Sequence, residues 1–147
     1  MSYTYKDNTA EFQAALKKAT ERGLKAIGMA AEGNAKREIT KKVYSRGNND
    51  KKYRLTGRLR NSITFAVSGE KANIPSYTTD DGSNGGVYEG TAPEDKGKAV
   101  YIGSNVEYAP YVELGTVNMR ARPFLRPAAT EHAAEYKRLM EESIKNA

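Results

Sequence analysis

A long amphipathic segment near the N-terminus constrains the fold more than any other feature of the sequence. Apolar residues recur at steps of three and four along it, which predicts one helix of roughly 35 residues with an apolar face. Asn8 and Glu11 have the spacing of a capping box, so we expect this helix to occupy most of residues 1–45. The residues of its apolar face are Phe12, Leu16, Ala19, Ile27, Ala30, Ala31, Ala35, Ile39 and Val43.

Three glycines interrupt the helical pattern. Gly23, Gly28 and Gly33 each cost about 1 kcal/mol relative to alanine in a helix. Their five-residue spacing does not place them on one face. We therefore expect either a bend or the close approach of different elements, rather than a single groove.

The remainder predicts a small sheet and a second helix. Thr56 is expected to cap a short turn through Arg60, and alternation over residues 56–68 then predicts a half-buried strand. A second strand is expected at residues 99–104 and a C-terminal helix at residues 124–145. The sequence thus predicts a single α+β domain, residues 1–147, with both helices packed on a small antiparallel sheet.

Residues 69–98 form a long polar connection between the two predicted strands. The stretch is rich in Gly, Asp, Ser and Thr, and its centre has no apolar period. A connection this long without core residues usually carries function or is disordered. We expect a mobile loop, with a possible hairpin around Val87 and Tyr88, that becomes ordered on assembly.

Composition excludes several classes of protein. The 147 residues contain no cysteine, which rules out disulfides, thiolate metal sites and a cysteine nucleophile. The chain does not open on a charged region followed by an apolar run, and it has no apolar stretch of about 18 residues. We expect a soluble protein suited to a reducing cytosol, without membrane contact.

The charge is unevenly distributed. Residues 1–60 carry a net charge of +9 and residues 61–147 a net charge of −3. This basic segment could face phosphates or an acidic protein, or it could be a solvated helix end and loop. With Tyr44 and Tyr53 interleaved for stacking, the patch makes a small DNA- or RNA-binding module the alternative function. Its candidate residues are Lys41, Lys42, Arg46, Lys51, Lys52, Arg54, Arg58 and Arg60.

Catalytic patterns are scarce. His132 is the only histidine, and with Glu135 on the same helix face it falls short of a metal site. No Gly-x-Ser-x-Gly elbow accompanies it, and the glycines of residues 82–86 lack the Lys-Ser/Thr of a phosphate-binding loop. We therefore expect no enzyme activity, no cofactor and no metal.

Residues 108–128 contain two rigid turns rich in aromatic residues and proline. Residues 108–114 predict a short helix closed by Gly115 as a left-handed cap. Tyr108, Tyr111, Phe124 and Leu125 are expected to pack between helices. Glu113 could pair with an arginine of its own chain or of a neighbouring subunit. The candidate subunit-interface residues are Tyr108, Tyr111, Glu113, Gly115, Thr116, Arg120, Arg122 and Arg126.

Two sequence motifs carry a resemblance to a protein family. Tyr-Ala-Pro-Tyr-Val-Glu-Leu-Gly-Thr at residues 108–116, followed by Arg-Pro-Phe-Leu-Arg-Pro-Ala at residues 122–128, resembles the signature of Hong Kong 97-type phage neck proteins. Thr-Gly-Arg-Leu-Arg-Asn-Ser-Ile at residues 56–63 is similar to that family's other motif, and both occur in the family's order. Residues 69–98 are longer than the family's usual connection.

This resemblance implies a structural role in the virion. Members are tail-completion, or head–tail joining, proteins, so a ring of six copies between the head-closure protein and the tail terminator is expected. The resemblance also implies assembly in the host cytoplasm and allows contact with DNA in the channel.

Overall fold

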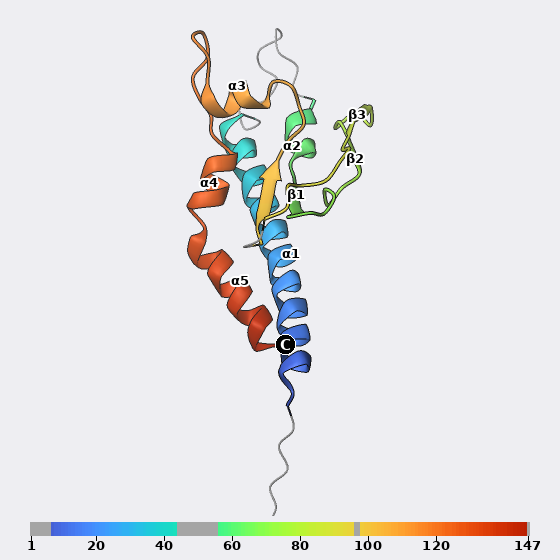
Figure 1. Ribbon diagram of the computed structural model, residues 1–147. Helices are drawn as coiled ribbons and strands as arrows, with labels where there is room; N and C mark the ends of the chain where they lie inside the picture. The colour runs from blue at the N-terminus through green and yellow to red at the C-terminus, as the bar shows by residue number, and fades with distance from the viewer. Residues whose placement is uncertain (1–6, 44–55, 96–97, 147) are drawn as a thin grey trace, which may run out of the picture.

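The fold is built on one long helix that the other elements flank. Figure 1 shows the computed structural model, which describes residues 7–43, 56–95 and 98–146. Long helices at both ends of the chain and a small antiparallel sheet confirm the α+β prediction. The elements in chain order are α1 (Thr9–Lys42), α2 (Arg58–Ser62), β1 (Thr64–Val67), β2 (Ser76–Thr78), β3 (Asn84–Val87), β4 (Val100–Gly103), α3 (Ala109–Leu114), α4 (Leu125–Thr130) and α5 (Ala133–Lys145).

The start of α1 differs from the predicted capping box. Asn8 is the residue that precedes the helix, but its side chain makes no capping hydrogen bond. Instead Asp7 Oδ1 accepts the backbone N–H of Thr9 at 2.9 Å. The side-chain and backbone hydrogen bonds from Thr9 lower the pKa of Asp7. A charged acceptor one residue earlier has replaced the neutral amide as the local partner.

Two of the three glycines in α1 allow close approach by different elements. A Cβ on Gly23 would lie 2.6 Å from Met140 Sδ of α5, and a Cβ on Gly28 would lie 2.2 Å from the ring of Phe65 on β1. Gly33 has only the side chain of Arg37 nearby. The predicted close approach of different elements is therefore confirmed.

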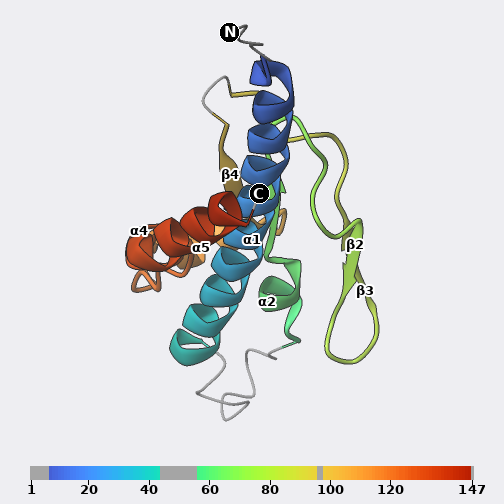
Figure 2. The ribbon, with the colours of Figure 1, turned by 90° about the horizontal axis from the view of Figure 1, so that it is seen from below.

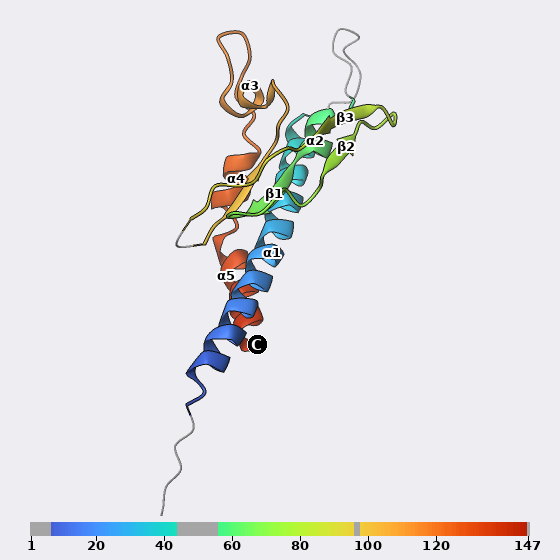
Figure 3. The same cartoon turned by 45° about the vertical axis from the view of Figure 1, so that its right-hand side comes forward.

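The apolar face of α1 is covered only along part of its length. Ala19, Ala35 and Ile39 are buried, but Phe12 is 68% exposed and Leu16 is 38% exposed. The expectation that the first turns pack on the domain is thus wrong. The cover from α5 ends near Ala19, whose carbonyl accepts a hydrogen bond from Ser143 Oγ at 2.5 Å, and the helix projects beyond that point (Figures 1 and 3).

The predicted strand pair is confirmed. β1 and β4 are antiparallel, with Thr64 opposite Gly103 and Val67 opposite Val100. One face of this ribbon packs on α1 through Phe65. The prediction of a half-buried strand is wrong, because residues 88–93 lie along the other face and leave Thr64 only 4% exposed.

Residues 69–98 contribute to the core, contrary to the sequence analysis. β2 and β3 form an antiparallel hairpin, and Tyr77 of β2 is buried in the main apolar cluster. The ring of Tyr77 packs on Gly85 and Gly86, where any Cβ would lie within 2.6 Å of it. The polar composition hid one aromatic anchor and the glycines that accommodate it. Mobility before assembly stays a prediction.

The C-terminal helix is divided rather than continuous. Glu131 and His132 separate α4 from α5, so the prediction of one helix over residues 124–145 is wrong. α4 packs on α1 and β4, whereas α5 follows α1 (Figure 1). Tyr136 Oη donates to the carbonyl of Ala128 across the break and accepts from Asn34 Nδ2 of α1 at 3.0 Å. The change of direction lets both short helices keep contact with α1.

Candidate assembly surface

Residues 108–126, which we call the α3–α4 block, form a rigid corner. α3 has Pro110 in its first turn, and Gly115 closes it by donating its N–H to Tyr111 O at 2.8 Å. Gly115 has φ 78° and ψ 173°, so the predicted glycine cap is confirmed but its backbone is extended rather than helical. A Cβ there would lie 2.7 Å from the backbone nitrogen of Ala121. Only glycine fits this position without strain.

Glu113 joins the two halves of the block. Its Oε2 accepts the backbone N–H groups of Phe124 at 2.7 Å and Leu125 at 3.0 Å, and its Oε1 accepts that of Arg126 at 2.9 Å. These amides begin α4 and would otherwise lack partners in the helix. The carboxylate is therefore a helix cap supplied from another helix, in place of the predicted Glu113–Arg pair. Its role toward a neighbouring subunit stays a prediction.

The loop after α3 is held open by backbone bonds. Thr116 and Met119 form an isolated bridge, with Thr116 N donating to Met119 O at 2.9 Å. Arg122 N donates to Val112 O at 2.8 Å and returns the chain to α3. The loop protrudes beyond α3 at the top of the view in Figure 3.

Apolar side chains of the block divide into a buried and an exposed group. Phe124 is fully buried and Leu125 packs against the core, as predicted. The exposed group contradicts the expectation that both tyrosines pack between helices. It consists of Tyr108 at 39% exposure, Tyr111 at 58%, Leu114 at 77% and Val117 at 102%.

The structure separates the residues of the predicted basic patch. Arg46, Lys51, Lys52 and Arg54, like Tyr44 and Tyr53, lie outside the described residues. Lys41 and Lys42 line a hollow of about 380 Å³ together with Arg120 and Arg122 of the block. Lys42 Nζ also donates to Pro123 O at 2.7 Å and lies 3.3 Å from Glu38 Oε2.

Arg58 and Arg60 bind the hairpin of their own chain. Arg58 Nε donates to Gly85 O at 3.2 Å, and Arg60 Nη2 lies 2.9 Å from both carboxylate oxygens of Asp80. Asn61 Nδ2 donates to Thr78 O at 2.8 Å and to Asp80 Oδ1 at 3.0 Å. The motif at residues 56–63 therefore holds the β2–β3 hairpin, a role that no local spacing in the sequence indicated.

The start of this motif also differs from the prediction. Gly57, with φ 74°, directly precedes α2, and the helix continues to Ser62. Thr56 Oγ1 still accepts the N–H of Arg58, at 3.3 Å. Gly57 is required here because a Cβ would lie 2.4 Å from the carboxylate of Asp80.

Aromatic hydroxyls anchor the other side of the hairpin. Tyr77 Oη donates to Asn105 Oδ1 at 2.5 Å, and Tyr88 Oη donates to the carbonyl of Ser62. The two rings lie 5.8 Å apart. Burial raises the pKa of Tyr88 to about 12, so the hydroxyl stays a donor at neutral pH.

The only histidine lies in a structural cluster. His132 Nδ1 is 3.4 Å from Glu135 Oε2, which confirms that the two share a helix face. Asn34, 2% exposed on α1, donates to Glu135 and Tyr136 and accepts from Arg37. Burial raises the pKa of Tyr136. Within the described residues, no group of three His, Cys, Asp or Glu could hold a metal ion.

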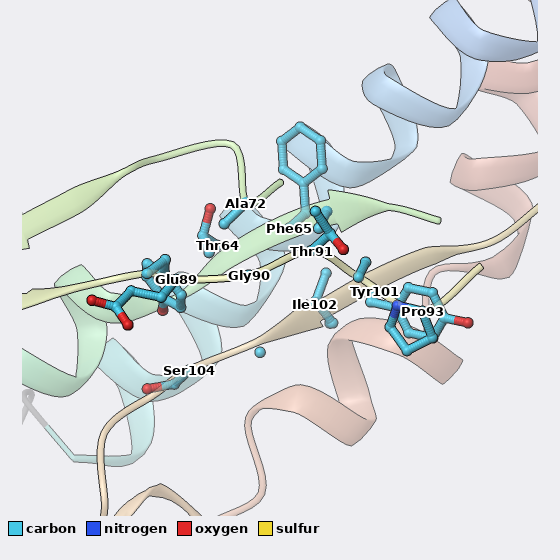
Figure 4. A pocket seen from close by; sticks show the side chains of 14 residues that line it. Thr64, Phe65, Ala72, Glu89, Gly90, Thr91, Pro93, Tyr101, Ile102 and Ser104 are labelled. Atoms are coloured by element: carbon cyan, nitrogen blue, oxygen red, sulfur yellow. The ribbon is translucent and has the colours of Figure 1, made fainter. Parts of the chain in front are cut away.

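A cavity of about 280 Å³ lies between the β1–β4 ribbon and residues 88–93 (Figure 4). Thr64, Tyr101 and Pro93 contribute to its wall, and Glu89 is its one carboxylate. A single carboxylate among hydroxyl, glycine and apolar groups offers no acid–base pair and no nucleophile with a base. No helix within the described part of the chain has the length and apolar character needed to span a membrane.

The profile of the HK97-gp10-like family matches residues 5–115, and this protein belongs to that family. The family is described as "Bacteriophage HK97-gp10, putative tail-component". The match covers α1, the motif at residues 56–63 and α3, and it ends at Gly115. No curated protein and no solved structure matches the chain. Membership of a family of phage tail components is consistent with a structural role in the virion and favours a non-catalytic one.

Proposed function

We propose that this protein is a structural component of the phage neck. In this proposal six copies form a ring that joins the head-closure protein to the tail terminator, and the protein performs no catalysis. The observation that carries the proposal is the α3–α4 block, where Glu113 and Gly115 hold an exposed apolar surface in one conformation. A surface that is already ordered loses little entropy when it binds a partner.

The exposed side chains of the block support contact with protein. Leu114 and Val117 are almost fully exposed on a loop that backbone bonds keep in place. Apolar groups in such positions commonly mark interaction sites. The assembled ring is expected to bury Tyr111, Leu114 and Val117 against a neighbouring copy or an adjacent ring.

Negative-stain electron microscopy tests the proposal directly. The purified protein would be imaged alone, with the cognate head-closure protein, and with tail tubes capped by the tail terminator. We expect rings, or single rings stacked on tube ends. Persistent monomers that bind neither partner would contradict the neck function.

DNA binding is the second candidate, favoured by the hollow that Lys41, Lys42, Arg120 and Arg122 line. Against it, Arg58 and Arg60 of the predicted patch bind the hairpin. A binder that depends on phosphate contacts loses affinity steeply as salt rises. Ring assembly by packed apolar corners should change much less, so a salt series for DNA binding and for assembly separates the two.

A further inference from the structure

The α3–α4 block and the β2–β3 hairpin lie on opposite sides of the molecule. In Figures 1 and 3 α3 and α4 lie on one side of α1 and the hairpin lies on the other. Figure 2, viewed from below, again has α1 between α4 and the hairpin. Two such sides can meet when copies of one chain are placed next to each other in the same orientation.

The two sides carry opposite charge. The block contains Arg120, Arg122 and Arg126, while the oxygens of its one acid, Glu113, accept bonds from the start of α4. Residues 69–95 contain six acidic residues and a single base, Lys71. Glu70, Glu89 and Glu94 are exposed on that side. Charges of opposite sign on facing surfaces steer association and fix its register.

Each side also presents apolar surface. Tyr111, Leu114 and Val117 are exposed on the block, and Val87 is 55% exposed at the end of β3. Apolar contact supplies affinity at the centre of an interface, and charged pairs at its rim contribute less. Both components are therefore present on both sides.

We propose that neighbouring copies meet through these two surfaces, with the basic block of one copy against the acidic hairpin side of the next. This inference rests on the proposed ring and identifies the surfaces that would form it. Because the two surfaces differ, the contact is head-to-tail, and a constant rotation from copy to copy closes it into a ring.

Charge reversal tests the pairing in the full-length protein. The basic variant carries Arg120→Glu and Arg126→Glu, the acidic variant carries Glu89→Lys and Glu94→Lys, and a third variant carries all four changes. We expect self-association at low salt to weaken about tenfold or more in each two-site variant, since several weak pairs turn repulsive. The four-site variant should recover to within a few-fold of the unaltered protein, as measured by sedimentation velocity.

A matched control separates this contact from an effect of net charge. Lys18→Glu with Lys25→Glu makes the same change in net charge on exposed positions of α1, away from both surfaces. It should leave self-association unchanged, and circular dichroism should show that all variants fold. High salt should reduce the differences among the variants.

A second measurement detects the contact even where association is weak. The chain has no cysteine, so Val117→Cys mixed with Val87→Cys can form a disulfide only between copies. We expect a crosslinked dimer from the mixture, and a ladder of larger species from a chain that carries both changes. Either variant alone should crosslink far less.

The outcomes separate this contact from the function itself. Rings formed equally by every charge variant would overturn the contact and leave the neck function standing. Failure of the unaltered protein to assemble, even on tail tubes, would overturn both. A basic variant that loses DNA binding while it associates normally would assign the block to DNA instead.

Discussion

The α3–α4 block and the β2–β3 hairpin are both attached to the core by polar side chains, but by different kinds of bond. In the block, one half-buried carboxylate receives three consecutive backbone amides. In the hairpin, an exposed ion pair between Arg60 and Asp80 accompanies the buried ring of Tyr77. The block is therefore rigid through its backbone, whereas the hairpin depends on one aromatic anchor and a set of surface contacts.

This difference bears on assembly. Bonds to helix-terminal amides persist in high salt better than an exposed ion pair does, because the partners are partly shielded from water. We expect the block to be preformed in the isolated chain and the hairpin to adjust when a neighbour binds. The following four changes test the comparison.

Tyr77→Ala should have the largest effect. Removing a buried aromatic ring costs about 3–5 kcal/mol of unfolding free energy, and the hairpin should detach from α2 as well. Urea denaturation would measure the loss, with the exposed neighbour Thr78→Ala as control. A loss below about 1 kcal/mol would mean that the hairpin is not part of the core.

Glu113→Ala should destabilise the protein by about 2–3 kcal/mol, since three amides at the start of α4 lose their acceptor. Glu113→Gln keeps one oxygen and should fall in between. Glu107→Ala, an exposed acid just before α3, is the matched control. If Glu113→Ala matched this control, the block would not depend on the carboxylate for its rigidity.

Asp80→Asn should cost about 0.5–1 kcal/mol at low salt, as is usual for an exposed ion pair. The difference from the unaltered protein should shrink in high salt, while that of Glu113→Ala should persist. Glu89→Gln provides an exposed acid for comparison. Equal salt sensitivity of the two losses would remove the distinction between the two regions.

Alkaline pH should have the smallest effect, with none at neutrality. Tyr88 has a pKa of about 12 in the folded chain against 10.0 for the ordinary group, so the folded state holds its proton more tightly. Stability from this residue is complete below pH 10 and declines as the pH rises toward 12. Thermal unfolding across this range should show a steeper decline for the unaltered protein than for Tyr88→Phe. Parallel curves would refute the assignment to Tyr88.

Much of the fold could be predicted because it depends on local periodicity. The length of α1, the β1–β4 pair and the glycine after α3 all follow from residue spacing within one element. The errors concern which surfaces meet. Phe12 and Leu16 continue the apolar period of α1, yet no described element covers them. Periodicity identifies a face that can be buried, but not how far its partner extends.

The candidate surface was predicted less completely than the fold. The segment around residues 108–128 was recognised as rigid, and the exposed Tyr111 and Arg120 belong to it. The bonds that make it rigid were not recognised, because Glu113 and the amides at the start of α4 are separated by a loop of free length. Asp80 likewise gave no sign in the sequence that it would pair with Arg60.

The sequence by itself determined the element types, the absence of cysteine chemistry and the family to which this protein belongs. These properties depend on residue identity and short-range spacing, which the chain carries without reference to its fold. Only the tertiary structure decided that Glu113 caps α4, that α2 holds the hairpin and that opposite charges lie on opposite sides of α1. Each of these depends on which distant segments meet, and that is set by packing of the whole chain rather than by any local pattern.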